Sequence, residues 1–291
     1  MRIGFMPGEA NALHRSGQRE PALASALDRR RVQCVPARRR FRRYLGIDYS
    51  GAATAETPLP GIRVQSAEAP GAPPQEIQGP GLGGRWSRRE LALWLAHVLQ
   101  DAQPTIIGLD HGLSCPLPYF KRHGIPLDWD AFLDDFARHW PTDRAEVTVR
   151  SLRPGNARAG EPRWRRPCEQ RTGAKSVFHF DVPGSVANST HAGLPWLRRL
   201  RATLGPALHC WPFDGWQPAA DRHVLAEIYP SRWSDQWPRE DRMPDQHDAY
   251  AVAAALAAAD GSGELEAWLQ PALPPAERAA ARVEGWILGV S

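Results

Sequence analysis

The sequence predicts an α/β fold in which helices flank a mixed sheet. Three short apolar segments, residues 44–48, 105–110 and 224–229, have the length and composition of buried strands. Two longer segments have helical patterns: residues 87–101 place apolar side chains on one face, and residues 245–259 are rich in alanine. Strands that give way to alternating helices and strands are typical of a mixed sheet covered by helices.

The remaining elements complete this pattern along the chain. Ser87 and Glu90 have the spacing of a capping box, so a helix is expected to start there. Residues 144–176 are rich in arginine and are predicted to be irregular. Further expected elements are strands at 61–65 and 207–213, a weak strand near Glu76, helices at 128–139 and 185–204 (the second bent or begun at Pro195), and a short helix near Leu265.

Residues 1–43 differ in composition from the rest of the chain. They hold eleven Arg and three acidic residues, a net charge of +8, whereas the whole chain carries +4, so residues 44–291 carry −4. One interpretation is a basic arm that contacts phosphates. We favour the other, a disordered or mis-assigned start, because polar segments without an apolar face cannot offset their ordering entropy. The predicted domain spans residues 44–291.

The composition indicates a globular protein. The chain has no apolar run near the ~18 residues that cross a bilayer, and no signal-type stretch at its start. Cys34, Cys115, Cys168 and Cys210 form no C-x-x-C pair, which disfavours a zinc ribbon and fits a reduced compartment. We expect a cytoplasmic protein without a membrane partner.

Acidic residues stand at or near the ends of the predicted strands. Asp48 and Asp110 each close an apolar strand, and parallel neighbouring strands would bring both carboxylates to one edge of the sheet. Glu227 interrupts an otherwise apolar strand, where an unpaired carboxylate is costly. Asp245 and Asp248 are three residues apart and share a helix face. We therefore expect these acids to converge.

Converging carboxylates without matching Lys or Arg repel one another, and a divalent metal would relieve that repulsion. Oxygen-only ligands favour Mg²⁺ or Mn²⁺, and two such ions ~3.5–4 Å apart can activate a water for phosphodiester cleavage. Each acid also has a structural alternative: Asp48 and Asp110 could form Asx-turns, Glu227 could lie on an exposed edge, and Asp245 with Asp248 could cap their helix. The joint pattern favours the metal site.

At these residues the chain resembles the RNase H-like superfamily and, more closely, the predicted nucleases of domain-of-unknown-function family 429. The spacing Asp245-x-x-Asp248 is also similar to the last helix of bacterial Holliday-junction resolvases. His111-Gly112 departs from the apolar residue and Pro that many relatives have after this acid. The similar segments, within about residues 44–288, are residues 46–51, 108–110, 175–178, 184–186, 193–200, 227–230 and 248–251.

The resemblance implies a five-stranded RNase H-like sheet and predicted nuclease activity. It also implies metal at four acids, Asp48, Asp110, Glu227 and Asp248.

The segment from Arg150 to Lys175 could contact nucleic acid. Arginines around Trp164 would supply phosphate contacts and a surface on which a base stacks, whereas a solvated loop would have the same composition. His247, beside Asp248, could shuttle a proton or lie on the solvent side of its helix. The candidate nucleic-acid contacts are Arg163, Trp164, Arg165, Arg166, Arg171 and Lys175.

The leading hypothesis is a phosphodiesterase that uses Mg²⁺ or Mn²⁺ to cleave DNA or RNA. One alternative is a catalytically silent nucleic-acid-binding protein on an RNase H-like scaffold. The other is an actin-like ATPase or phosphotransferase, which needs a Gly-rich phosphate loop after the second acidic strand. Residues 111–115 supply little of such a loop.

Overall fold

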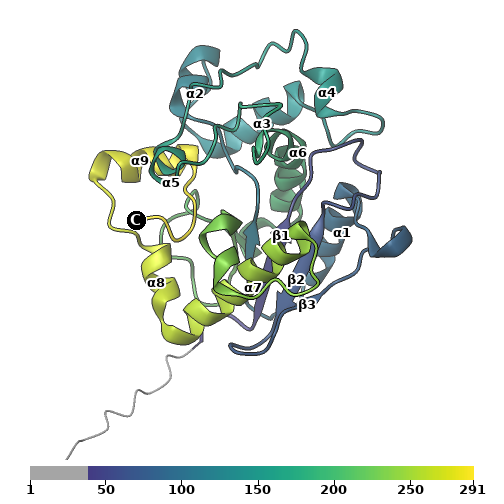
Figure 1. The fold of residues 1–291 in the computed structure, drawn as a ribbon. Helices are drawn as coiled ribbons and strands as arrows, with labels where there is room; N and C mark the ends of the chain where they lie inside the picture. Colours follow the sequence, from purple (N-terminus) through teal and green to yellow (C-terminus); the bar gives the residue numbers. More distant parts are fainter. Residues whose placement is uncertain (1–38) are drawn as a thin grey trace, which may run out of the picture. The chain divides into compact units, whose positions relative to one another are not determined.

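The computed structural model describes residues 39–291, which form a six-stranded mixed sheet flanked by helices (Figure 1). The strands are β1 (Arg43–Asp48), β2 (Arg63–Ala67), β3 (Gln75–Glu76), β4 (Thr105–Leu109), β5 (Leu208–Cys210) and β6 (His223–Glu227). Their order is β3-β2-β1-β4-β6-β5. β1, β4, β6 and β5 are parallel, and β2 is antiparallel to both β1 and β3. The predicted α/β class is confirmed, with six strands where about five were expected.

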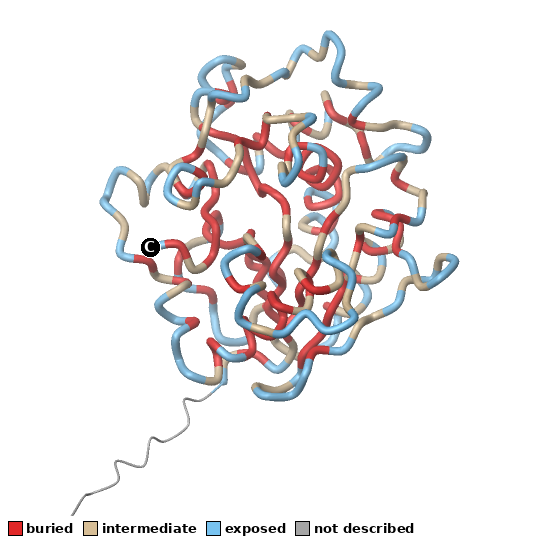
Figure 2. Tube along the Cα trace, in the orientation of Figure 1, coloured by how far each residue is buried: buried red, intermediate tan, exposed pale blue. Residues whose placement is uncertain are grey.

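The two faces of the sheet contribute to different hydrophobic clusters. Ile47 and Leu225 belong to the cluster on one face, and Tyr44 and Val224 belong to the cluster on the other. This division follows from the alternation of side chains along each strand. Figure 2 shows that residues of the central strands are buried. The main helices over these faces are α1 (Arg88–Val98), α3 (Trp129–His139), α6 (Ala187–Leu204) and α7 (Pro244–Ser262).

α7 lies directly on the second face, in front of β1 and β2 in Figure 1. Its contact with β1 is between backbones, because a Cβ at Gly46 would come 2.1 Å from the carbonyl oxygen of Ala249. A glycine in β1 and small residues on α7 are therefore needed for this approach. On the opposite face, Leu91 and Leu95 of α1 and Leu197 of α6 lie beside the strands.

The helix starts follow local sequence signals. Ser87 Oγ accepts a hydrogen bond from Glu90 N (3.2 Å) and the Glu90 carboxylate accepts one from Ser87 N (3.1 Å), so the predicted capping box is confirmed. α6 begins at Ala187 and continues through Pro195, so the proline does not start the helix. The shorter helices are α2 (Leu117–His123), α4 (Val149–Leu152), α5 (Pro167–Thr172), α8 (Glu264–Leu269) and α9 (Pro275–Glu284).

The start of the domain differs from the predicted boundary at residue 44. Phe41 is fully buried, and the backbone N–H groups of Arg40 and Phe41 donate to the Asp260 carboxylate on α7. Residues 39–43 therefore belong to the folded domain, because they bury an aromatic ring and satisfy a carboxylate. The rest of the predicted extension, residues 1–38 with Cys34, lies outside the described residues.

Two further properties concern the described part of the chain. Cys115, Cys168 and Cys210 are buried free thiols. No helix within residues 39–291 combines the length and the hydropathy that a bilayer span requires.

Candidate functional site

β1 and β4 end side by side at one edge of the sheet. Ile47 pairs with Leu109 in the parallel register, and the N–H of Asp110 donates to the carbonyl of Ile47 at 3.0 Å. The next residues along the two strands are Asp48 and Asp110, so both carboxylates are placed at this edge. Asp48 lies two residues after Gly46 and shares its face of the strand, the face that packs on α7.

The first turns of α7 bring two more carboxylates to the same place. Burial and the negative charges of Asp110, Asp245 and Asp248 raise the pKa of Asp48 well above its usual range. Burial and the charge of Asp248 raise the pKa of Asp110 to about 7. Carboxylates affect each other's ionisation in this way only when they are close. The charge of Glu227 also raises the pKa of Asp110, so all five predicted acids lie near one another, four of them on the α7 side.

Two of these four carboxylates, Asp48 and Asp248, accept hydrogen bonds from neutral donors. The N–H of Tyr49 donates to Asp48 at 3.0 Å, and the hydroxyl of Ser234 donates to Asp248 at 2.6 Å. Within residues 39–291, no salt bridge involves any of the four. The repulsion predicted for converging acids is therefore not offset by an ion pair here, although Arg166 lines the same small cavity as Asp110.

Glu227 is in a different environment. It pairs in register with Leu109, whose side chain belongs to the face opposite α7. Both of its oxygens accept hydrogen bonds from Arg166, at 2.5 and 2.7 Å, and one also accepts from Leu113 N at 3.2 Å. The expectation of acids converging without a matching arginine is wrong for Glu227, because Arg166 neutralises it.

Arg166 is the centre of a buried ion cluster. Its side chain is fully buried and also bonds Glu169 through Nε at 2.9 Å and the Glu284 carbonyl through Nη1 at 3.2 Å. We call Arg166, Glu169 and Glu227 the closed cluster, and Asp48, Asp110, Asp245 and Asp248 the open cluster. Arg166 was a candidate phosphate contact, and its burial corrects that expectation.

The other candidates for nucleic-acid contact are mostly used inside the protein. Arg165 donates to the backbone carbonyls of Glu169 and Ala174, at 2.5 and 2.6 Å. Trp164 is partly buried and packs edge-on against Phe178. Arg163 is ion-paired with Glu161, Arg171 is ion-paired with Glu277, and Lys175 donates to the Pro183 carbonyl. These five side chains are therefore held by contacts within the protein, and only Arg163 among their cations has a largely exposed side chain.

His247 was considered as a proton shuttle or a solvent-side residue. It is buried, and its Nε2 lies 2.8 Å from the carbonyl of Ser234, the residue whose hydroxyl binds Asp248. Its Nδ1 is buried without a hydrogen-bond partner in the described part of the chain. The solvent-side interpretation is wrong, because the loop carrying Ser234 packs over this turn of α7.

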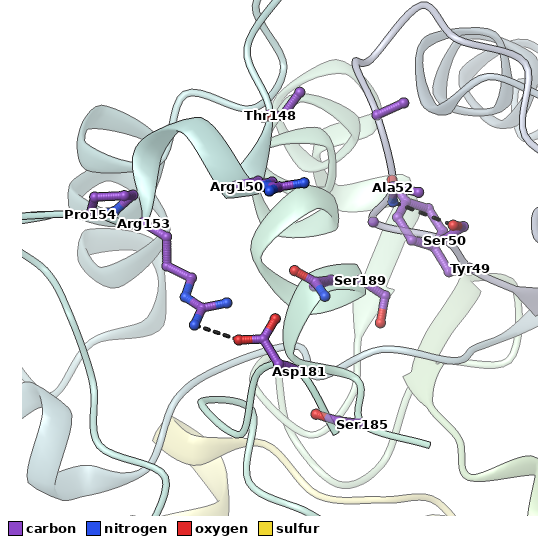
Figure 3. Close-up of a pocket in the computed structure, with 13 residues that line it drawn as sticks. Tyr49, Ser50, Ala52, Thr148, Arg150, Arg153, Pro154, Asp181, Ser185 and Ser189 are labelled. Carbon is purple, nitrogen blue, oxygen red and sulfur yellow. Dashed lines mark hydrogen bonds and ion pairs between the residues drawn. The ribbon is translucent and has the colours of Figure 1, made fainter. Parts of the chain in front are cut away.

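A cavity of about 910 Å³ opens against the loop that follows Asp48 (Figure 3). Its lining includes Tyr49 and Ser50, the residues directly after Asp48. The sequence did not single out this cavity, because its walls come from three separate segments. They are residues 49–53, residues 148–154, and residues 181–189 before and at the start of α6.

The open cluster has the donor chemistry of a site for a hard divalent cation. Among residues 39–291, no three His, Cys, Asp or Glu side chains are arranged so that they could hold one metal ion. Mg²⁺ is nevertheless usually bound through one or two carboxylates, with water and phosphate oxygens as its other ligands. Asp48 and Asp110 fit this requirement, whereas Glu227 does not, since its oxygens already accept from Arg166.

The comparisons with known proteins gave no match. No family model, curated protein or solved structure is similar to the chain at a significant level.

Proposed function

We propose that this protein is a metal-dependent phosphodiesterase that cleaves nucleic acid at the open cluster. One observation carries the proposal: Asp48 and Asp110 lie together at the end of parallel strands, with raised pKa values, and neither is in a salt bridge within residues 39–291. Such a pair is unfavourable by itself and becomes favourable when a divalent cation binds.

An RNase H-like fold is part of this proposal. The resemblance implies a sheet of five strands, whereas this sheet has six. The additional strand is β5, which has three residues and lies at the edge of the sheet. The acids at the ends of β1 and β4 and on α7 support the same assignment. Glu227 is excluded from the metal ligands that the resemblance implies.

Asp48 and Asp110 would hold the cation, Mg²⁺ or Mn²⁺, with Asp245 and Asp248 contributing from α7. When bound, the cation would lower the pKa of a water and offset the charge of the phosphodiester. Asp48 and Asp110 would stay ionised in its presence, although burial favours their protonated forms without it. Ser234 would orient Asp248 through the hydrogen bond to its carboxylate.

The test compares melting curves of the wild type, Asp48→Asn, Asp110→Asn and Glu227→Gln in EDTA and in excess Mn²⁺. We expect Mn²⁺ to stabilise the wild type, by about 2.7 kcal/mol at one hundred times Kd, because it binds only the folded state. Both Asp variants should lose most of that gain while remaining at least as stable as wild type in EDTA. Glu227→Gln is the control and should keep the gain.

Cleavage of labelled oligonucleotides with Mn²⁺ completes the test. The wild type should cleave and both Asp variants should not. If Asp48→Asn is less stable in EDTA and gains as much from Mn²⁺ as the wild type, the carboxylate is structural and the proposal is wrong.

A further inference from the structure

The cavity against the loop that follows Asp48 has the charge opposite to that of the open cluster. Its lining contains two arginines, Arg150 and Arg153, and one acid, Asp181. Arg153 is bound to Asp181 at 2.5 Å and lies over the ring of Phe180. Figure 3 shows this ion pair on the wall facing Tyr49 and Ser50. The lining is therefore net positive, and it includes the two residues that follow Asp48.

Arg150 is the cation that remains available. It is exposed, and no salt bridge among residues 39–291 includes it. It lies on α4, which begins at a capping box made by Thr148 and Ser151. The backbone that carries Arg150 is thus fixed while its guanidinium is free to bind an anion.

The opposite wall adds one neutral side-chain donor, the amide of Asn188, because the hydroxyl of Ser189 already donates to the Val186 carbonyl at 3.0 Å. Asn188 and Ser189 lie in the first turn of α6, an 18-residue helix with no side-chain cap. A helix start of this kind favours negative charge. Gly51 packs directly on that turn, since a Cβ there would come 2.1 Å from the Asn188 carbonyl oxygen. The loop after Asp48 and the start of α6 therefore form one continuous wall.

The lining is suited to phosphate and sugar rather than to bases. Its one aromatic residue, Tyr49, is buried, with its ring packed edge-on against His111. Strand-binding proteins that hold bases use exposed aromatic rings for stacking. A cavity of about 910 Å³ also matches the ~300–1,000 Å³ that encloses a ligand of small-molecule size. This volume fits a short stretch of one strand.

We propose that this cavity binds the sugar-phosphate backbone of a single nucleic-acid strand, with Arg150 as its main phosphate contact. This inference rests on the proposed function, because it assigns the cavity as the path by which the strand reaches Asp48 and Asp110. Recognition here is independent of base sequence, since contacts to phosphate carry no sequence information. A free nucleotide carries the same phosphate chemistry, and the experiment separates the two.

The experiment measures anisotropy of a labelled single-stranded oligonucleotide in EDTA, with Asp110→Asn as the parent protein. This background removes one repelling charge and prevents cleavage. Adding Arg150→Gln should weaken binding roughly tenfold at low salt and reduce the slope of log K against log salt by about 0.7. Adding Arg163→Gln is the matched control, because Arg163 is exposed, ion-paired and outside the cavity, and it should change neither quantity.

Four outcomes would overturn the inference. They are no binding by the parent, equal effects of the Arg150 and Arg163 changes, tighter Arg150-dependent binding of a duplex than of the single strand, and displacement of the strand by a nucleoside monophosphate at equal concentration. A cleavage assay with Mn²⁺ separates this inference from the proposed function. Arg150-dependent binding without any wild-type cleavage would refute only the function, and cleavage with an unchanged KM in Arg150→Gln would refute only the cavity.

Discussion

Two groups of acids lie at the same end of the strands and differ in their charged partners. In the closed cluster, one buried guanidinium bonds both oxygens of Glu227 and one of Glu169. In the open cluster, the charged neighbours of Asp48 and Asp110 are each other and the acids of α7, and Glu227 of the closed cluster also acts on Asp110. The side of the strand on which an acid stands decides which of these environments it enters.

The difference shows how a carboxylate's partners indicate its role. A buried carboxylate bonded by an arginine has its charge compensated and several of its lone pairs occupied, so it binds a metal less well. A buried carboxylate beside other carboxylates has a raised pKa, and an external cation favours its ionised form. The two clusters should therefore respond oppositely to the loss of a charge.

The largest effect is expected from Arg166→Met. Removing the guanidinium leaves Glu227 and Glu169 buried and uncompensated, which should lower the free energy of unfolding by about 3–5 kcal/mol. Urea denaturation in EDTA measures this change. Arg163→Met, at an exposed position, should change stability by no more than about 0.5 kcal/mol.

If Arg166→Met does not fold, the double variant Arg166→Met with Glu227→Leu should recover part of the stability. The double variant removes the guanidinium together with the Glu227 carboxylate, and replacing both members of a buried ion pair by apolar residues is often tolerated. A loss below about 1 kcal/mol in the single variant would contradict the closed cluster as described.

The open cluster should make the free energy of unfolding fall as pH rises, whereas an ordinary carboxylate paired with a cation makes it increase. Because the folded pKa of Asp110 is raised from 3.8 to about 7, the folded state keeps a proton that the unfolded state loses above pH 4. The free energy of unfolding in EDTA should therefore fall as pH rises from about 4 to about 7. One pKa unit corresponds to about 1.4 kcal/mol.

The measurement is the difference between the stability curves of wild type and Asp110→Asn over this pH range. The difference is needed because the pKa of Glu284, near the closed cluster, is also raised to about 7 by burial and contributes a slope of the same sign. The free energy of unfolding of Asp110→Asn should increase relative to that of the wild type as pH rises. Parallel curves would show that Asp110 ionises normally. Excess Mn²⁺ at pH 8 should restore the stability that the wild type loses in EDTA.

The smallest effect is expected at Asp260, a third kind of carboxylate on the same helix as Asp245 and Asp248. It accepts hydrogen bonds from Arg40 N, Phe41 N and the Tyr44 hydroxyl, the last at 2.7 Å. Asp260→Asn should cost about 1–2 kcal/mol, because a buried acceptor of neutral donors is weakened. The loss should be the same in EDTA and in Mn²⁺, and a loss that Mn²⁺ repairs would place Asp260 in the open cluster.

The sequence by itself determined the strands that carry the acids and the helix that faces them. Hydrophobic runs ending in Asp48 and Asp110 predicted β1 and β4, and the Ala-rich pattern after Asp245 predicted α7. These signals are local, since they depend on burial period and on turn chemistry within a few residues. The amphipathic α9 was missed, as was the contribution of Phe41, whose burial depends on contacts with distant parts of the chain.

Only the tertiary structure decided which acids act together. Glu227 and Asp110 follow similar apolar strands, yet the register of β4 with β6 turns Glu227 toward the face where Arg166, 61 residues earlier, reaches it. Arg150 and Asn188 likewise meet across the cavity from separate segments. The physical reason is that pairing of charges depends on distance in space, whereas the sequence records only which residues are able to pair.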